Sequence, residues 1–333
     1  DVERSRGLGD VYKRQTQNRA LTANDYETLI PSKIYPETES ISVFGGEDLI
    51  PPQYGKVFIS IKPKNGKYLS QIEKIELKNK LKRYTVAGIL PNIIDLKYLY
   101  VEMDSSVYYN ANAVNSVNAL KTAVVSTLDT YSRSSELNTF GARFKFSKAM
   151  RLVDQTDTAI TSNITRIAMR RDMRPALADL ATYELCYGNR FHKDMEGFNI
   201  RSSSFKLEGV EGSVYLSDLP DETGDTGTIR YFTIVDEKPN YINLNAGVVD
   251  YAKGEIILYP TNISSTGLTD KVEIEVIPES NDIIAKQNLY IVLDTTGNSK
   301  LNLLEDVLVS GSNISGTNYT PPSSFISNKK YTR

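Results

Sequence analysis

The sequence has almost none of the side chains from which most enzyme and metal sites are built. Its 333 residues include one cysteine, one histidine and no tryptophan. A single thiol, Cys186, cannot close an intramolecular disulfide or build a cysteine zinc cluster. Any catalytic triad or multi-histidine metal site would have to use His192 alone. We therefore expect no catalytic residue, no cofactor and no metal, and the protein is predicted not to be an enzyme.

The sequence also lacks the features of membrane and nucleic-acid binding. No run approaches the ~18 apolar residues that a membrane span requires, and no basic stripe interleaved with aromatic residues is present. The 39 Lys+Arg and 41 Asp+Glu are unevenly distributed: residues 201–333 carry 11 and 18, and residues 1–200 carry 28 and 23. Two oppositely charged halves favour contact between copies of the chain.

The residues that are abundant suit a protein of strands and contact surfaces. The sequence contains 21 Tyr and 10 Phe, and 40% of its residues are hydrophobic. Aromatic side chains are enriched in strands and in buried interfaces. A chain of this length is expected to form two or three domains at roughly 100 to 200 residues each.

The first fifteen residues, DVERSRGLGDVYKRQ, differ from the rest of the chain. They have no apolar stretch and no amphipathic period, so they predict neither a signal peptide nor a helix. They are similar to translated adapter sequence at the ends of metagenomic reading frames. We expect residues 1–15 to be non-native or disordered, and the chain from Thr16 onward to be part of a longer protein.

Residues 16–175 predict an α+β domain. Thr22 is placed to cap a helix that Pro36 would stop. Helices are expected at 25–34, 70–84, 114–131 and 147–153, and strands at 40–44, 57–61, 98–103 and 160–169. This order suggests a mixed sheet with helices on one face.

Beyond Pro175 the helical period gives way to short alternating runs. Residues 176–294 predict a mostly β domain, sandwich-like or barrel-like, in which the run at 272–276 is one strand. Residues 249–256 predict a strand, a tight turn and a second strand, with Gly254 at the position that tolerates positive φ. Residues 295–333 are expected to be a C-terminal extension.

Three motifs could belong to a catalytic or metal-binding site. Gly45-Gly46-Glu47-Asp48 is comparable to the Gly-Gly-acid-acid hairpin of diguanylate cyclases, but Pro51 and Pro52 would prevent that hairpin. The structural reading is that the glycines permit positive φ and that the acids cap or pair locally.

The other two motifs are weaker. Cys186 and His192 could form a nucleophile and base, although their apolar neighbours favour a packed thiol. The third is an acidic loop that could hold calcium, although its spacing is not that of an EF-hand and a solvated turn is the default. The acids of this loop are Asp218, Asp221, Glu222 and Asp225.

Several ordered runs together resemble one family. The longest is Val43-Phe-Gly-Gly-Glu-Asp48, continued by Pro51-Pro52 and by Tyr54-Gly-Lys-Val-Phe-Ile-Ser-Ile-Lys-Pro63. Arg19-Ala-Leu-Thr22, Ile34-Tyr-Pro36 and Val249-Asp-Tyr251 with Gly254 add to it. Together they resemble the wedge protein six family of the baseplates of T-even-type contractile-tailed phages, which is related to the wider J-like baseplate proteins.

This resemblance implies a structural virion protein with no catalytic residue to carry over. It implies a wedge subunit in the tail baseplate, assembled in the host cytoplasm, that pairs with itself and contacts other wedge and hub proteins in a ring during sheath contraction. Members of the family are about twice as long, so the chain would match their C-terminal half. The residues that carry the motif, all in structural roles, are Gly45, Gly46, Glu47, Asp48, Pro51, Pro52, Tyr54, Gly55, Asp250, Tyr251 and Gly254.

Two other classes of function stay open at this point. The Tyr and Asn content permits a surface adhesin whose β domain binds carbohydrate. The acids Glu47 and Asp48 leave a nucleotidyl cyclase as a more remote alternative.

Overall fold

The computed structural model describes residues 19–310 except 50, 268 and 296, so the prediction for residues 1–15 lies outside the described residues. The chain folds into two compact units. Unit 1 contains the residues up to Lys97 together with 138–142 and 285–290, and unit 2 contains the rest. The predicted domain boundary at residue 175 stays a prediction, since the compact units divide the chain elsewhere.

Unit 1 is built on a three-stranded sheet, β1 (Thr38–Gly45), β2 (Lys56–Pro63) and β3 (Leu90–Ile94). β1 runs antiparallel to β2, and β3 runs parallel to β2 after the crossover helix α3 (Gln71–Leu81). The core between the sheet and the helices is apolar. It includes Tyr26, Ile30, Ile34, Ile59, Ile61, Leu77 and Leu81, all at most 4% exposed.

The predicted helix at 25–34 forms as two pieces. Thr22 caps α2 (Ala23–Leu29) and forms a capping box with Asp25, as its position predicts. The chain then widens into the π-helix η1 (Ile30–Ile34), where Tyr35 N–H donates to the Ile30 carbonyl at 2.8 Å. Pro31 has no N–H to continue the α-helical ladder, which explains the change.

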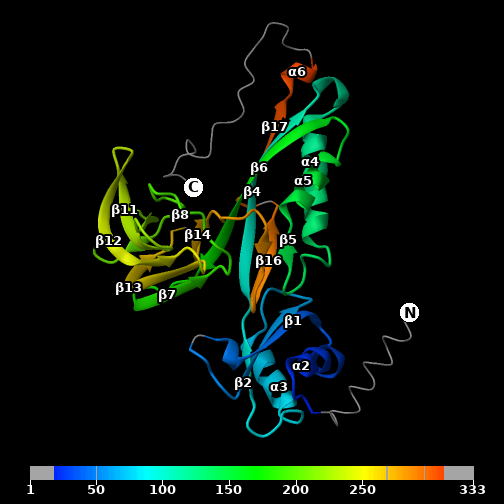
Figure 1. Cartoon of the computed structure of the whole chain (residues 1–333), viewed down its shortest axis with the longest axis vertical. Coiled ribbons are helices and arrows are strands. Elements are labelled where there is room, and N and C mark those ends of the chain that lie inside the picture. Colours follow the sequence, from blue (N-terminus) through cyan, green and yellow to red (C-terminus); the bar gives the residue numbers. More distant parts are fainter. Residues whose placement is uncertain (1–18, 50, 268, 296, 311–333) are drawn as a thin grey trace, which may run out of the picture. The chain divides into compact units, whose positions relative to one another are not determined.

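The α+β part of unit 2 (Figure 1) contains a second sheet, in the order β16-β4-β6-β14-β8 with β17 also on β4. Its strands are β4 (Lys97–Tyr109), β6 (Ile160–Met173), β8 (Ile200–Ser202), β14 (Val272–Val276), β16 (Leu289–Asp294) and β17 (Lys300–Glu305). The helices α4 (Val117–Ser132) and α5 (Phe146–Asp154) lie side by side along β4 and β6. The shorter elements are η3 (Ala111–Ala113), β5 (Arg143–Phe144), β15 (Ile283–Ile284) and α6 (Val307–Ser310).

The remaining strands form a curved, half-barrel sheet in the order β10-β11-β12-β13-β7, with β9 on β13. They are β7 (Leu180–Cys186), β9 (Lys206–Leu207), β10 (Val214–Pro220), β11 (Thr226–Val235), β12 (Lys238–Asp250) and β13 (Glu255–Ser265). The predicted fold class, α+β followed by a mostly β region, is confirmed. No helix among the described residues is long and apolar enough to cross a membrane.

Two details of the predicted arrangement differ. The four strands predicted before residue 175 divide between two sheets instead of sharing one, and the unpredicted β5 pairs with β15 in a third sheet. The run at 272–276 joins β6, placing Ile274 opposite Arg171, and so belongs to the second sheet and not to the half-barrel. Both differences have the same cause: local alternation identifies a strand, whereas its partner is selected by packing far along the chain.

A buried ion cluster crosses the second sheet. The Arg170 guanidinium, only 5% exposed, donates from Nε to Glu102 at 2.5 Å, donates to Asp172, and lies 3.3 Å from Glu273. The Asp294 carboxylate, on β16, lies 3.5 Å from the same guanidinium. Burial lowers the pKa of Arg170, but the surrounding carboxylates outweigh that effect and hold it above its usual value. The guanidinium therefore links β4, β6, β14 and β16 as a permanent cation.

The N-terminus of α3 predicts one pH effect. The backbone and side chain of Ser70 and the Tyr35 hydroxyl hydrogen-bond the Glu73 carboxylate and lower its pKa below 4.5. A lowered folded-state pKa gives stability that is present above pH 4.5 and is lost as the pH falls through the folded value. Urea unfolding between pH 6 and 3 should show a smaller acid loss in Glu73→Gln than in the parent. Solvent screening limits the difference to about 0.5 kcal/mol, and equal slopes would contradict it.

Candidate functional site

The Gly-Gly-acid-acid segment forms a tight loop between β1 and β2 in unit 1. Gly45 ends β1, and Gly46 begins the 3₁₀ turn η2 (Gly46–Asp48). The Gly46 carbonyl accepts the Gln53 N–H at 2.8 Å, and a Cβ built on Gly46 would lie 2.0 Å from the Gln53 carbonyl oxygen. Close approach of two backbone segments therefore requires glycine here.

The prediction that this glycine pair adopts positive φ is wrong. Gly45 has φ −73°, and the glycines with positive φ near the loop are Gly55 and Gly88. The carbonyl of Gly55, which has φ +75°, accepts the N–H of Leu90 and so joins the loop to β3. The acids Glu47 and Asp48 lie exposed on the turn.

Three residues of the loop face solvent. Pro51 and Pro52 are exposed, and the Tyr54 side chain is 80% exposed. Exposed aromatic and proline side chains suit contact with another protein. The loop does not pair as the two strands of a cyclase hairpin, since η2 follows β1 and β2 begins only at Lys56.

The second motif segment lies in the half-barrel, where Tyr251 follows β12. The Tyr251 hydroxyl donates to the Asp218 carboxylate at 2.6 Å, and that carboxylate also accepts the Ile200 N–H at 2.8 Å. Arg230 donates to the Asp218 carbonyl oxygen at 2.7 Å. All of these groups are buried, so Asp218 joins β8, β10 and the β12–β13 turn from inside the structure.

Burial determines the protonation of this cluster. Asp218 has no exposed surface, and desolvation raises the pKa of its carboxyl despite the bonds from Tyr251 and Ile200, which lower it. Desolvation, followed by the negative charge of Asp218, raises the pKa of Tyr251 far above its ordinary value. The tyrosine therefore stays a neutral donor at every physiological pH.

The turn from Asp250 to Gly254 confirms the predicted strand, turn and strand. Gly254 has φ +72°, its N–H donates to the Asp250 carbonyl, and its own carbonyl accepts the Tyr187 N–H at 2.8 Å. A Cβ on Gly254 would lie 2.0 Å from the Asn189 carbonyl oxygen. The glycine is needed both for its backbone angle and for this close approach.

The acidic loop considered for calcium is organised differently. Asp218 is buried with Tyr251 and does not join the other three acids, so the predicted set of four is not assembled. Lys193 Nζ donates to the carbonyls of Asp221 and Gly224 inside the loop, and Arg190 lies 3.5 Å from the Asp225 carboxylate. Cations of the protein thus occupy the region where a calcium ion would have to bind.

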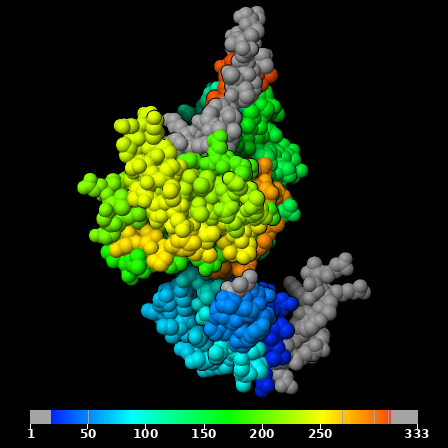
Figure 2. Space-filling view, turned by 60° about the vertical axis from the view of Figure 1, so that its left-hand side comes forward, coloured from blue at the N-terminus to red at the C-terminus, as the bar shows by residue number. Residues whose placement is uncertain are grey.

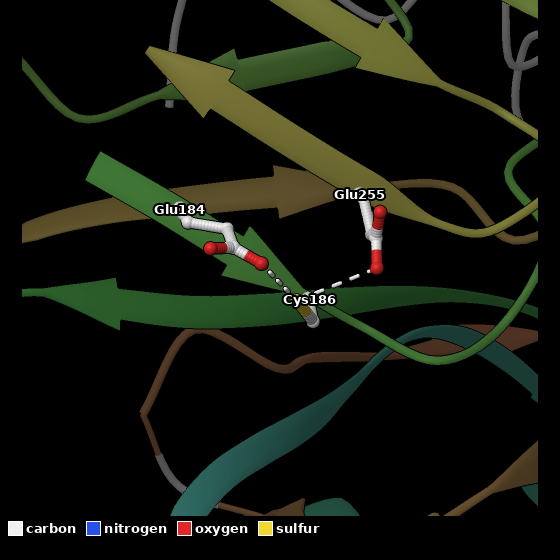
Figure 3. Close-up of side chains that lie close together, drawn as sticks. All are labelled: Glu184, Cys186 and Glu255. Atoms are coloured by element: carbon white, nitrogen blue, oxygen red, sulfur yellow. Dashed lines mark hydrogen bonds between the residues drawn. The ribbon is translucent and has the colours of Figure 1, made fainter. Parts of the chain in front are cut away.

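Cys186 ends β7 between two acids (Figure 3). Its thiol lies 3.4 Å from Glu184 Oε1 on the same strand and 3.7 Å from Glu255 Oε1 on β13. The three side chains are near enough to bind one metal ion, yet the two thiol hydrogen bonds also account for the arrangement. A nucleophilic thiol is usually placed beside a cation or a base, and the two groups here are carboxylates. His192 is exposed, and its backbone N–H donates to Ile277.

Asp218, Arg230 and Arg170 organise the structure, although sequence patterns barely indicate them. All three lie in strands, and the alternation of polar and apolar residues does not show which polar side chains are buried. Packing against other strands buries them. The sequence does not identify Asp218 as the partner of Tyr251; it indicates only that a buried tyrosine hydroxyl needs some partner.

Two successive stretches of the chain match known family models. Residues 22–94 match the model described as baseplate structural protein gp6, C-terminal domain I. Residues 97–172 match baseplate structural protein gp6, C-terminal domain III. The resemblance predicted from the sequence motifs is thereby confirmed, and the boundary between the two matches coincides with the end of the first segment of unit 1 at Lys97.

A gp6 relative is also found among curated proteins. The baseplate wedge protein gp6 of Enterobacteria phage T4 is 33% identical over 175 residues, which cover 52% of this chain and 26% of the relative. The chain thus spans about a quarter of that gp6 sequence. A chain in the cryo-EM structure of the anti-feeding prophage baseplate is 14% identical over 50% of this chain and 37% of its own length, with a TM-score of 0.37. That likeness is too small to inform the fold.

Proposed function

We propose that the chain is a structural part of a phage tail baseplate wedge. The observation that carries the proposal is the succession of two gp6 domain matches over 22–172, in the order that the compact units also follow. Its location would then be the tail baseplate of the virion, and its partners would be other baseplate proteins. The proposal includes pairing with a second copy and contacts around a ring.

The motif segments support a structural role. Gly46, Gly254 and the Asp218–Tyr251 pair are used to hold strands and turns at fixed distances. Tyr54 on its ordered loop offers contact surface in unit 1. Rigid units with exposed aromatic contact residues suit a part that must stay joined while an assembly rearranges.

A chimera tests the baseplate role. Residues 19–310, which include every strand of both units, would replace the corresponding part of T4 gp6 in phage lacking its own copy. We expect baseplates in negatively stained lysates, and none from the same chimera carrying Gly46→Val, whose side chain would collide with the Gln53 carbonyl. A chimera that is soluble and folded by circular dichroism but yields no baseplates would count against the proposal.

Self-association needs a separate measurement. Sedimentation of residues 16–333 over a range of protein and salt concentrations should show dimers or larger species, weakened by salt because oppositely charged regions of the chain would face each other. A monomer at every concentration would remove pairing from the proposal and leave the baseplate role to be decided by the chimera.

A further inference from the structure

The hairpin of β11 and β12 has one unpaired edge. β12 pairs with β11 from the Thr226–Asp250 pair to the Val235–Lys238 pair, with register shifts between Tyr241 and Asn243 and between Asn243 and Gly247. It pairs with β13 only from Gly247 to Asp250. Within residues 19–310, leaving out 50, 268 and 296, no strand pairs with the other edge of residues 238–246. Figure 1 shows this hairpin extending beyond the rest of the half-barrel.

The separation of β12 from β13 has a cause in the sequence. Gly247 is opposite Leu258, so a continued ladder would bring Asn245 opposite Pro260. Proline has no N–H to donate, and the ladder ends before it. The Asn245 N–H instead donates to the Asn243 side chain at 2.9 Å. The edge of β12 is therefore left open by a built-in feature of β13.

The open edge bears exposed apolar side chains. Leu244 is 63% exposed and Ile242 is 40% exposed, and Tyr259 at the start of the separation is 42% exposed. A lysine or proline within an edge strand normally blocks pairing with other chains; in β12 both occur at its start, as Lys238 and Pro239, and neither occurs between 240 and 246. An apolar edge without such protection is the surface that an added strand covers.

Packing on the other face keeps this edge extended. Tyr241 is opposite Phe232, whose ring lies 6.1 Å away, and the Arg230 guanidinium lies 4.6 Å from the Tyr241 ring centre. Tyr215 stacks on Phe232 at 5.7 Å. An incoming strand would thus meet a preformed edge, which lowers the entropy cost of binding.

Charge selects the kind of strand. Residues 205–265, which make up most of the half-barrel, contain four Lys+Arg and ten Asp+Glu. Asp236 and Glu237 lie at the tip of the hairpin itself. Figure 2 shows this part of the chain in yellow-green and yellow. An acidic surface attracts a basic partner and repels a copy of itself.

We propose that residues 240–246 of β12 accept an extended, basic segment of another protein as an added β-strand. Main-chain hydrogen bonds to the open edge would supply the affinity, and alternate apolar side chains of the segment would cover Ile242 and Leu244. The proposal does not depend on the baseplate role, because it concerns only the chemistry of this edge.

A synthetic peptide of alternating Lys and Val, acetylated and amidated at its ends, is the probe. Hydrogen exchange of the whole chain should slow by about tenfold at residues 240–246 when about nine-tenths of the chains hold peptide, and be unchanged elsewhere in the half-barrel. The same peptide N-methylated at every residue keeps its charges and side chains but loses the backbone N–H donors of both edges, so it should give no protection.

Two variants keep the test specific. Leu244→Lys adds a blocking charge to the edge and should abolish the protection. Leu177→Lys makes the same change at a 53% exposed leucine outside any strand and should leave it intact. Equal exchange with and without peptide would overturn the proposal, as would equal protection by the N-methylated peptide or by a peptide of alternating Glu and Val. If the protection of 240–246 rose with the concentration of the chain alone, the added strand would come from a second copy of the chain. That result would also overturn the proposal.

Discussion

Replacing Arg170 by methionine is expected to lower the free energy of unfolding of unit 2 by about 3–5 kcal/mol. The guanidinium is buried against Glu102, Asp172, Glu273 and Asp294, and it also lies 4.1 Å from the Tyr100 ring centre. Methionine fills much of the volume but removes the cation beside Glu102 and Asp294, whereas Asp172 and Glu273 keep their ion pairs with Lys271. Urea unfolding followed by circular dichroism and tyrosine fluorescence measures the loss.

The matched control for Arg170 is Arg174→Met. Arg174 pairs with Asp270 at 3.4 Å, but both side chains are well exposed, so the pair should contribute ~0–1 kcal/mol. The double variant Arg170→Met with Glu102→Gln should recover part of the loss, because it removes one of the unpaired charges. A loss no greater than that of Arg174→Met would show that the cluster is hydrated and contributes little.

The second large effect is expected at Gly254. A substitution to alanine would place a Cβ 2.0 Å from the Asn189 carbonyl oxygen in a backbone of φ +72°. Left-handed backbone costs a non-glycine residue about 1–2 kcal/mol, and the enforced shift of backbone adds about 1–3 kcal/mol. The midpoint temperature of thermal unfolding should therefore fall strongly. The amide proton of Tyr187, which is hydrogen-bonded to the carbonyl of residue 254, should exchange faster with solvent.

Gly209 separates these two contributions. It lies in the same unit with φ +76°, but nothing is within 4 Å of its built Cβ. Gly209→Ala should cost only the conformational part, about 1 kcal/mol. Equal losses at both positions would mean that the contact with Asn189 relaxes freely and that Gly254 is required for its backbone angle alone.

Sequence patterns predict elements well where one face is buried against a single layer. The stripe of α4 is buried at Leu120, Val124, Leu128 and Tyr131, as its spacing predicts, although Val117 at its start is 41% exposed. Strands are missed where the alternation is broken. β3 contains Pro91, which argues against a strand but is tolerated at a sheet edge, and β12 contains Pro239 and several asparagines.

The sequence motifs identified the positions of the site residues better than the contacts that these residues make. The family resemblance singled out Gly46, Tyr251 and Gly254 as motif residues. In the structure each of them makes a close contact with another segment of the chain. The resemblance could not identify Asp218 as the partner of Tyr251, because the two are 33 residues apart and meet only after the half-barrel closes. Interactions at that separation depend on sheet order, which local periodicity does not encode.

The division of unit 1 among three stretches of chain has a consequence for any attempt to isolate it. Asn138 donates to Glu39 and accepts from the Tyr290 hydroxyl, and Phe140 packs edge-on against Tyr290 at 5.2 Å. A truncation that ends at Lys97 would remove all of these contacts although it keeps every strand of the sheet. The folded unit that contains the first match is thus completed by eleven residues encoded far downstream, and gene fusions or deletions made at the boundary of the match would still cut through that unit.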